Sequence, residues 1–497
     1  MGMGRRTVPD GAVAGRTAVD RPAAGGTLPV TRALVLAAGL GSRLRHETPK
    51  PLFPVMGVPL LARTLFTLEQ AGIADAYVVL GYEGERIRRE IEKIDRFGIR
   101  IHWLLNDRWR EPNGVSVLAA EGTLTEPFIL TMSDHLFEVE AVERLRAASG
   151  RLSGILLVAD PRIDAVNDPD DATKVRLEDG RIADIGKSLS DFDAIDTGVF
   201  LASPVLFAAL RSVEGASGPS LSDGVRKLAH EGRAHVVDGS GIEWQDVDTQ
   251  DDVRAAERML LARWPKPSDG PVARRFNRRI STAITRRLAG TGITPNQVSV
   301  ATMVVSLLSA ACAAVGGYGF WLASGILFQL ASILDGADGE LAILTFQSSR
   351  RGEWIDTLCD NISYVAFLVG LTAGAHRAML PPLYFWGGLA GITAAALSLM
   401  NINMYLVRER KSGSALSVRY AYRQGTGAVS RIMRAVHYLG RRDLFSFLVL
   451  LLAVVGRLPL ALPLFGLGAT LLLLPATTHA NLSDFFRARR VARLKYG

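Results

Sequence analysis

The sequence predicts two domains of different class in one chain: an α/β domain, followed by an all-α, polytopic membrane domain of about six transmembrane helices. One observation is length, because 497 residues exceed what a single hydrophobic core ordinarily organises. The other is the uneven distribution of apolar residues. Up to about Pro271, short apolar runs alternate with charged and turn residues, whereas long apolar runs dominate beyond about Gln297.

Changes in composition predict the domain boundaries. The first segment is rich in Gly, Ala, Arg and Pro and lacks the apolar run of a signal peptide, so it is predicted to be a disordered tail. The expected order is a tail over 1–31, an α/β domain over 32–265, a linker with a juxtamembrane helix over 266–292, a membrane domain over 293–486 and a basic tail over 487–497.

The formal net charge of +8 points to a membrane surface and not to nucleic acid. Many Lys and Arg residues stand beside apolar runs, and the chain has no motif that reads nucleic acid. The two cysteines, Cys312 and Cys359, both lie in apolar segments, which argues against a disulfide framework and a zinc site.

The membrane half divides into six candidate spans, each near the roughly 20 residues that cross a hydrocarbon core. They are 298–314, 321–346, 354–375, 383–407, 444–460 and 462–485. Basic residues gather in the loop 408–442, the hairpin 347–352 and the C-terminal tail, so the positive-inside rule places both termini and the α/β domain in the cytoplasm of the cell.

A basic segment precedes the first span. In it Phe276, Ile280 and Ile284 recur at helical spacing between arginines, which predicts an amphipathic helix on the membrane surface. A solvated linker is the alternative.

Four aspartates lie within the second and third spans, where an unpaired carboxylate is costly. Asp335 and Asp338 are three residues apart, and Asp356 and Asp360 are four apart, so each pair shares one helix face. The short hairpin between the spans predicts that the pairs converge, and the small residues Gly336, Gly339 and Gly352 predict close approach of the two helices. Converging carboxylates predict bound divalent cations, Mg²⁺ or Mn²⁺.

The pattern Asp335-x-x-Asp338-Gly339-x-x-Ala342, then Gly352-x-x-x-Asp356-x-x-x-Asp360, resembles the signature of the CDP-alcohol phosphotransferases. The resemblance implies that all four aspartates form the metal site, that Asp360 also takes the proton of the acceptor hydroxyl, and that the protein is a homodimer through this domain. Gly339, Ala342 and Gly352 would contact the nucleotide. The arginine that usually follows the alanine is Ile343 here. A transporter with a carboxylate relay is the competing interpretation.

In the α/β half, a predicted buried strand over 33–36 leads through a Gly loop into a helix. The loop fails as a dinucleotide fingerprint, because Leu44 occupies the place of the third glycine, and it lacks the Walker Gly-Lys-Ser/Thr. The stretch resembles the nucleotide loop of the sugar nucleotidyltransferases, which implies a Rossmann-like, GT-A-like fold. The matching residues are Ala38, Gly39, Gly41, Ser42, Arg43 and Lys50.

The same resemblance assigns roles. Arg43 would bind the β and γ phosphates of the nucleotide, and Lys50 would reach the α-phosphate. Asp134, at the end of an apolar strand, and Asp246, with Asp248 nearby, would hold Mg²⁺. Asn113, Gly114 and Ser116 would lie over the base, and Lys187 and Asp196 would face the sugar phosphate.

The two activities fit in series, because the first makes an NDP-alcohol and the second consumes a CDP-alcohol. The order of domains resembles the fused enzymes that make CDP-inositol from CTP and inositol-1-phosphate and then transfer phosphoinositol to a second inositol-1-phosphate, on the route to a compatible solute. A phospholipid synthase with a fused cytidylyltransferase for phosphocholine is the alternative, and a membrane-anchored binding protein without activity is a third. Arginines near the membrane, Arg278 among them, favour a phosphorylated acceptor.

Overall fold

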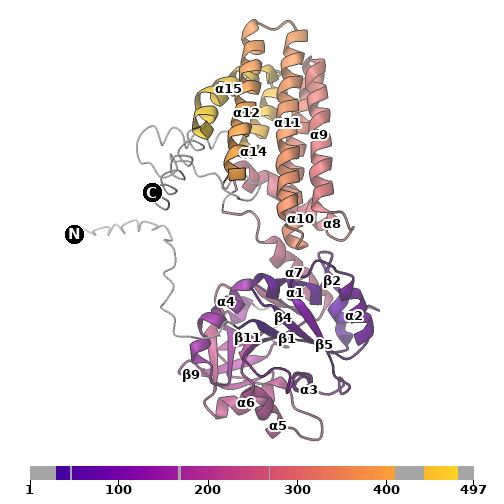
Figure 1. Ribbon diagram of the computed structural model, residues 1–497, viewed down its shortest axis with the longest axis vertical. Coiled ribbons are helices and arrows are strands. Elements are labelled where there is room, and N and C mark those ends of the chain that lie inside the picture. The colour runs from indigo at the N-terminus through magenta and orange to yellow at the C-terminus, as the bar shows by residue number, and fades with distance from the viewer. Residues whose placement is uncertain (1–29, 45–46, 166–169, 268, 409–441, 479–497) are drawn as a thin grey trace, which may run out of the picture.

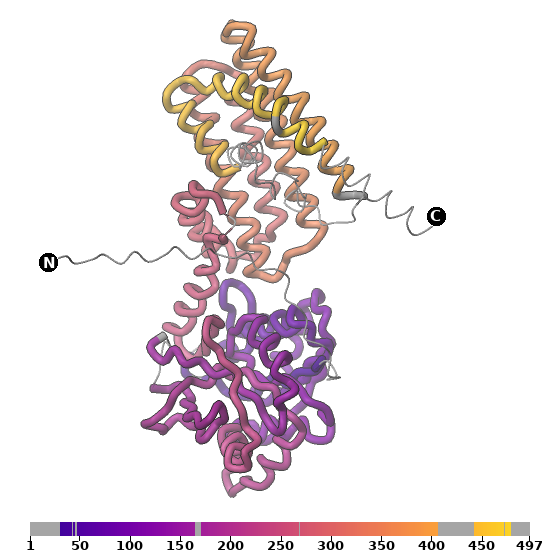
Figure 2. The backbone as a smooth tube through the Cα atoms, turned by 90° about the vertical axis from the view of Figure 1, so that its left-hand side faces the viewer, coloured from indigo at the N-terminus to yellow at the C-terminus, as the bar shows by residue number. Residues whose placement is uncertain are grey.

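The chain folds into two bodies stacked along the long axis of the molecule. The computed structural model describes residues 30–44, 47–165, 170–267, 269–408 and 442–478. Figure 1 shows the α/β domain at one end and a bundle of long helices at the other, and Figure 2 shows the same division from the side. The predicted tails, apart from residues 30 and 31, and most of the basic loop 408–442 lie outside the described residues.

The α/β domain is built on a nine-stranded mixed sheet in the order β5-β4-β1-β6-β11-β8-β12-β10-β9. Its first half is parallel and consists of β5 (Arg100–Leu105), β4 (Asp75–Leu80), β1 (Arg32–Ala37) and β6 (Phe128–Met132). Strand β11 (Ala194–Ala202) runs antiparallel to both β6 and β8 (Ile155–Asp160). The far edge holds β12 (Ala234–Asp238), β10 (Arg181–Gly186) and β9 (Lys174–Glu178). The predicted α/β class is confirmed.

Both faces of the sheet are buried, as the continuous apolar run of β1 requires. Ala33, Val35 and Ala37 belong to the core on one face, and Leu34 and Leu36 belong to the core on the other. The helices that accompany the sheet are α1 (Leu60–Gln70), α2 (Gly84–Glu92), α3 (Asn113–Leu118), α4 (Val139–Ala147), α5 (Val205–Ser212), α6 (Leu221–His230) and α7 (Gln250–Leu261).

Two short strand pairs extend the domain. One joins β2 (Pro54–Val55) to β3 (Val58–Pro59), and the other joins β7 (His135–Phe137) to β13 (Trp244–Asp246). The second pair brings Asp246 opposite His135, so residues more than a hundred positions apart meet beside the end of β6.

The membrane half is helical, as predicted. Five helices among the described residues are long and apolar enough to cross a membrane: Pro295–Val315 (α9), Tyr318–Leu344 (α10), Arg350–Arg377 (α11), Pro382–Tyr405 within α12 (Pro382–Arg408), and Leu458–Thr478, which includes α15 (Ala461–Gly468). The helical class is confirmed, and five of the six predicted spans overlap one of these helices over most of their length.

The fifth predicted span, 444–460, differs from the structure. There the described helix α14 (Arg442–Val454) has 13 residues and is followed by a turn at Gly456, whose φ is +74°. The last long helix begins at Leu458 and not at Leu462. Helix α14 packs tightly on α10, because a Cβ on Gly325 would lie 2.5 Å from the Cβ of Ala453.

The predicted amphipathic helix is present as α8 (Arg278–Leu288), preceded by a π-helical turn over Ala273–Asn277. Its hydroxyl side chains Ser281 and Thr285 are buried, whereas Phe276 and Ile280 are 47% and 37% exposed. Ile284, the third predicted apolar residue, is half-buried. Two of the three apolar side chains therefore point away from the protein, which is the orientation that contact with a membrane surface requires.

The two bodies share an apolar junction. Leu44 and Phe53 of the α/β domain belong to one buried cluster with Val298, Leu341 and Leu344 of the bundle. Beside this cluster, Phe346 at the end of α10 stacks on Phe66 of α1 with ring centroids 4.9 Å apart. The Gly loop of one domain and the acidic helix of the other therefore pack on the same junction.

Candidate active sites

The Gly loop follows β1 and holds Lys50 close to its backbone. Gly41 has φ +61°, and a Cβ there would lie 2.4 Å from the Cβ of Lys50, so only glycine fits. A Cβ on Gly39 would meet no atom within 4 Å, so this backbone is open to a ligand. Ala38 begins the loop, and Ser42 lies in the 3₁₀ turn Ser42–Leu44.

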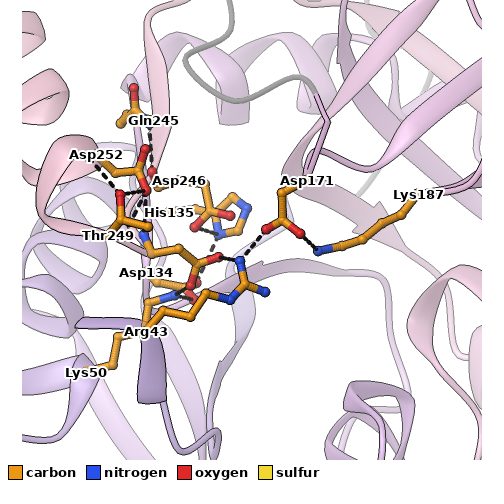
Figure 3. Close-up of polar contacts among 11 residues, drawn as sticks. Arg43, Lys50, Asp134, His135, Asp171, Lys187, Gln245, Asp246, Thr249 and Asp252 are labelled. Carbon is orange, nitrogen blue, oxygen red and sulfur yellow. Dashed lines mark hydrogen bonds and ion pairs between the residues drawn. The ribbon is translucent and has the colours of Figure 1, made fainter. Parts of the chain in front are cut away.

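Two cations of this loop region face a group of acids (Figure 3). The Nζ of Lys50 lies 2.5 Å from Oδ2 of Asp134 and also contacts Asp248. Arg43 contacts Asp171 and lies 3.2 Å from Asp248. Burial alone would lower the pKa of Lys50, but Asp134, Asp246 and Asp248 outweigh it and hold that pKa above its ordinary value. Lys50 is therefore a buried permanent cation.

Asp134, His135 and Asp246 form a set of potential metal ligands with one atom each within 4.8 Å of one another. The Nδ1 of His135 lies 2.9 Å from Oδ1 of Asp134 and 3.9 Å from Oδ1 of Asp246. Oδ1 of Asp246 is buried and has no hydrogen-bond partner among the described residues, and burial raises the pKa of this carboxyl to about 6. An orphaned carboxylate oxygen beside a second carboxylate suits a hard divalent cation.

His135 was not predicted. It follows Asp134 directly at the end of an apolar strand, and that position was its only signal in the sequence. Burial would lower its pKa, but Asp246 and Asp134 raise it to about 9. The neighbouring Asp248, predicted only as a nearby acid, instead bridges Lys50 and Arg43.

A cavity of about 280 Å³ opens beside these residues, lined by Arg43, Asn113, Asp134, Asp171, Lys187, Asp196 and Asp246, among others. The Nζ of Lys187 lies 2.9 Å from Asp171, so Lys187 and Arg43 share one carboxylate. Asp196 accepts a hydrogen bond from the backbone of Gly198 at 2.7 Å, and burial raises its pKa to about 6. Lys187 and Asp196, which were predicted to face the sugar phosphate, thus line the same cavity as Arg43, which was predicted to bind the phosphates of the nucleotide.

The three residues predicted to lie over the base have different surroundings. Asn113 lines the cavity, and its Oδ1 accepts a hydrogen bond of 2.9 Å from the backbone of Leu221 at the start of α6. Ser116 is buried, and its Oγ accepts a hydrogen bond from Asn106. Gly114 packs against the carbonyl oxygen of Pro219, which a Cβ would approach to 2.5 Å. Ser116 and Gly114 therefore contact other residues of the domain, whereas Asn113 lines the cavity.

In the bundle, Asp335, Asp338 and Asp356 converge as predicted, with one carboxylate oxygen each within 4.8 Å of one another. The Oγ of Ser299 on α9 donates to Oδ2 of Asp338 at 2.6 Å. Three carboxylates this close repel one another, and a divalent cation between them would relieve that repulsion.

Asp360, the fourth predicted ligand, is not among the three carboxylates that meet, and it contacts Arg442 of α14. Arg442 also contacts Asp335, and its guanidinium lies over the ring of Tyr364, 5.8 Å from the centroid. The sequence did not single out Arg442, since it stands in a loop whose charges all matched the positive-inside pattern.

The glycine interpretation requires correction. Gly336 and Gly352 do not bring α10 against α11. Gly336 faces Arg278 and Ser281 of α8, Gly352 faces Asn296 at the start of α9, and a Cβ on Gly339 would meet no atom of the described residues within 4 Å. Helix α9 packs on both α10 and α11 and holds them at the separation at which the carboxylates meet. Gly339 lies in the open, so its backbone is accessible, and Ala342 is half-buried one turn further along.

Of two further predicted positions, Ile343 lies at the junction of the domains and Arg278 lies between the linker and α10. Ile343 lines a second cavity of about 310 Å³ together with Arg63, Arg263 and Phe346. Ile343, which replaces the usual arginine of the signature, thus faces the α/β domain. Arg278 is fully engaged, because it donates to Asp269, to Glu340 and to the carbonyl oxygen of Gly336.

Comparisons with known proteins match each half separately. Residues 33–227 match the MobA-like NTP transferase domain, and residues 292–472 match the CDP-alcohol phosphatidyltransferase family. A solved inositol-1-phosphate CTP transferase of T. maritima shares 25% identity, with a TM-score of 0.43 over 48% of this chain and 98% of that chain.

Other relatives span both halves. The "bifunctional IPC transferase and DIPP synthase" of Rubrobacter xylanophilus is 38% identical, over 69% of this chain and 77% of its own length. The protein of the same name from Aquifex aeolicus is 31% identical, over 86% of this chain and 92% of its own length. Because one chain carries both domains and is similar to these relatives over most of their length, it belongs to the family of bifunctional IPC transferases and DIPP synthases.

Proposed function

We propose that this chain catalyses two consecutive reactions on inositol-1-phosphate. The α/β domain joins CTP and inositol-1-phosphate to give CDP-inositol and pyrophosphate. The membrane domain transfers phosphoinositol from CDP-inositol to a second inositol-1-phosphate and releases CMP. The observation that carries the proposal is the presence of two separate acidic sites on one chain, one facing the cations Arg43 and Lys50 and the other lying on α10 and α11.

In the first reaction, a phosphate oxygen of inositol-1-phosphate attacks the α-phosphorus of CTP, and the bond to the β-phosphate breaks. Negative charge moves onto the leaving pyrophosphate. Arg43 and Lys50 contact the acids of the site and can exchange these partners for phosphate oxygens. Lys187 and Asp196, across the same cavity, bind the phosphate and hydroxyl groups of the inositol.

In the second reaction, the carboxylate of Asp360 removes the proton from the acceptor hydroxyl. The hydroxyl oxygen attacks the phosphorus that carries the inositol, the bond to the bridging oxygen breaks, and CMP leaves with that oxygen. A base within hydrogen-bond reach contributes roughly 10²- to 10⁴-fold in rate. Arg442 lies beside Asp360 and adds a positive charge where phosphate charge gathers.

Both sites have the oxygen ligands that Mg²⁺ or Mn²⁺ prefers. Bound there, the ions would neutralise phosphate charge and stabilise the leaving groups. The proposed ligands are Asp134, Asp246 and His135 in the first site and Asp335, Asp338 and Asp356 in the second.

The proposal places the α/β domain and both termini in the cytoplasm and the bundle in the bilayer as a homodimer. The outward apolar face of α8 and the basic residues of its other faces support the first part. In this arrangement CDP-inositol leaves one site and enters the other on the same side of the membrane.

Mass spectrometry of the products tests the proposal. Purified full-length protein with CTP, Mg²⁺ and inositol-1-phosphate is expected to give CDP-inositol first and a phosphodiester of two inositol phosphates later. A matched reaction receives phosphocholine and diacylglycerol in place of inositol-1-phosphate. A choline lipid from that reaction, with no diester from the first, would replace the inositol proposal with the lipid one.

A further inference from the structure

Helix α10 carries an acid that neither catalytic set uses. Glu340 follows Asp338 by two residues, and its side chain is 0% exposed. A carboxylate removed from water is costly unless charged or polar donors surround it. The donors around Glu340 therefore identify what it holds in place.

All three donors to Glu340 come from one face of α8. Nη1 of Arg278 lies 2.8 Å from Oε1, and the Oγ of Ser281 lies 2.6 Å from the same oxygen. Oγ1 of Thr285 lies 2.7 Å from Oε2. The spacings of three and four residues place these donors one above another on one face of α8.

The contact continues along the backbone of α10 and into the linker. Nη1 of Arg278 also donates to the carbonyl oxygen of Gly336 at 3.2 Å, where a Cβ would already be tight. Its Nε and Nη2 donate to the two oxygens of Asp269 at 2.8 and 3.1 Å. Arg278 thus connects the linker to α10 at Gly336, a residue that lies between Asp335 and Asp338 in the sequence.

Gly336 and Glu340 are four residues apart and face α8, whereas Asp335 and Asp338 face the third carboxylate on α11. Rotation or sliding of α10 would break the contacts on the first face and move the carboxylates on the second. A divalent cation requires its oxygens at fixed separations of a few ångströms, so such movement weakens its binding.

We propose that Glu340 is a positioning residue for the second site: through Arg278, Ser281 and Thr285 it fixes the rotation and depth of α10, and so presents Asp335 and Asp338 at the spacing that a divalent cation needs. The inference rests on the proposed role of these aspartates as cation ligands. It assigns to α8 a part in the second reaction besides contact with the membrane.

The test is Mn²⁺ binding to detergent-purified full-length protein without substrate, followed by electron paramagnetic resonance. Wild type is expected to show two classes of site, of which Asp134→Asn removes the one in the α/β domain. Glu340→Gln keeps the shape and removes the charge. It is expected to weaken the other class at least about 10-fold, while CDP-inositol formation in the same sample is unchanged.

Gln329→Leu is the matched control. Gln329 also lies on α10, is buried, and donates to Asn277 at 2.9 Å, but it stands further from the aspartates. It is expected to lower the temperature of unfolding without changing Mn²⁺ affinity. If Glu340→Gln fails to fold, Thr285→Val removes one donor at constant shape and is expected to weaken the same class about 3-fold or more.

The outcomes separate two failures. If wild type shows a single class that disappears in Asp134→Asn, the proposed role of the membrane aspartates fails. If two classes are present and neither Glu340→Gln nor Thr285→Val weakens Mn²⁺ binding more than Gln329→Leu does, the aspartates remain ligands and the positioning role of Glu340 is overturned.

Discussion

In each proposed site a basic side chain contacts two of the acids. Lys50 contacts Asp134 and Asp248, and Arg442 contacts Asp335 and Asp360. Both cations lie where phosphate charge would arrive. Each cation can therefore balance the negative charge of the acids before the substrate binds and that of the phosphates afterwards. The charged side chains then need to move little when the substrate binds.

Replacement of Lys50 tests this arrangement in the first site. Lys50→Ala is expected to slow CDP-inositol formation by roughly 10²- to 10³-fold, because a preorganised charge at the transferring phosphate is lost. Lys93→Ala is the matched control, since Lys93 is exposed and pairs with Glu90 on the surface of α2. Equal rates for the two variants in a pyrophosphate-release assay would remove Lys50 from the mechanism.

The four membrane aspartates are expected to divide into two kinds. Asp335→Asn should raise the Mg²⁺ concentration needed for half-maximal CMP release, because it removes a ligand. Asp360→Asn should lower the rate by roughly 10²- to 10⁴-fold at every Mg²⁺ concentration, because it removes the base. The measurement is CMP release from supplied CDP-inositol across a Mg²⁺ titration. Identical profiles for both variants would contradict the separate role of Asp360.

At the scale of elements, the turn between β2 and β3 is fitted to the end of α8. Gly57 has φ +74°, and a Cβ there would lie 1.6 Å from the carbonyl oxygen of Ala289. Gly180, in the turn between β9 and β10, has φ +73° and nothing within 4 Å. The two glycines share the same backbone strain on substitution and differ only in the contact.

Gly57→Ala is therefore expected to destabilise the full-length protein more than Gly180→Ala does. In both variants the alanine must adopt a left-handed backbone conformation, which lowers the free energy of unfolding by roughly 1–2 kcal/mol. Gly57→Ala must also displace α8. Apparent melting temperatures of the two variants measure the difference. A melting temperature for Gly57→Ala at or above that of Gly180→Ala would show that the junction does not depend on this contact.

Regular elements were predictable because their signals are local. The apolar run of 33–36 and the aspartate spacings each predicted a strand or a helix face that the structure contains. His135 and Arg442 were not predictable as site residues, because their partners arrive through tertiary packing. Asp246 reaches His135 through the β7–β13 pair, and Arg442 meets Asp335 from 107 positions away. The glycine interpretation was wrong for the same reason, since sequence does not show that α8 packs on α10.

At the scale of the molecule, the two domains share a junction but keep separate cores. The two large clusters on the sheet faces consist of buried residues of the α/β domain alone. A third cluster joins Trp264 and Leu260 to Leu341 and Leu344. The α/β domain therefore has its own hydrophobic cores and is expected to fold by itself. Its junction face, which packs on the helical bundle, would then be exposed to water.

A chain that ends near Pro271 is expected to retain CDP-inositol formation within a few fold of the full-length rate. Because the junction face is uncovered in this truncated chain, the chain is also expected to self-associate more than an α/β domain of the same size that has no exposed apolar face. Size-exclusion chromatography with light scattering and a pyrophosphate assay on the same sample measure both. A monodisperse but inactive domain would show that the first site needs the membrane half.

We propose that one chain makes and consumes the same CDP-alcohol at two sites. The most direct test gives Lys50→Ala, Asp360→Asn and wild type the same labelled inositol-1-phosphate, CTP and Mg²⁺, and follows CDP-inositol and the diester over time. Wild type should form the diester, Asp360→Asn should accumulate CDP-inositol, and Lys50→Ala should form the diester only when CDP-inositol is added. Diester formation at the wild-type rate by Asp360→Asn, or by Lys50→Ala without added CDP-inositol, would show that the chain does not use these two sites in series.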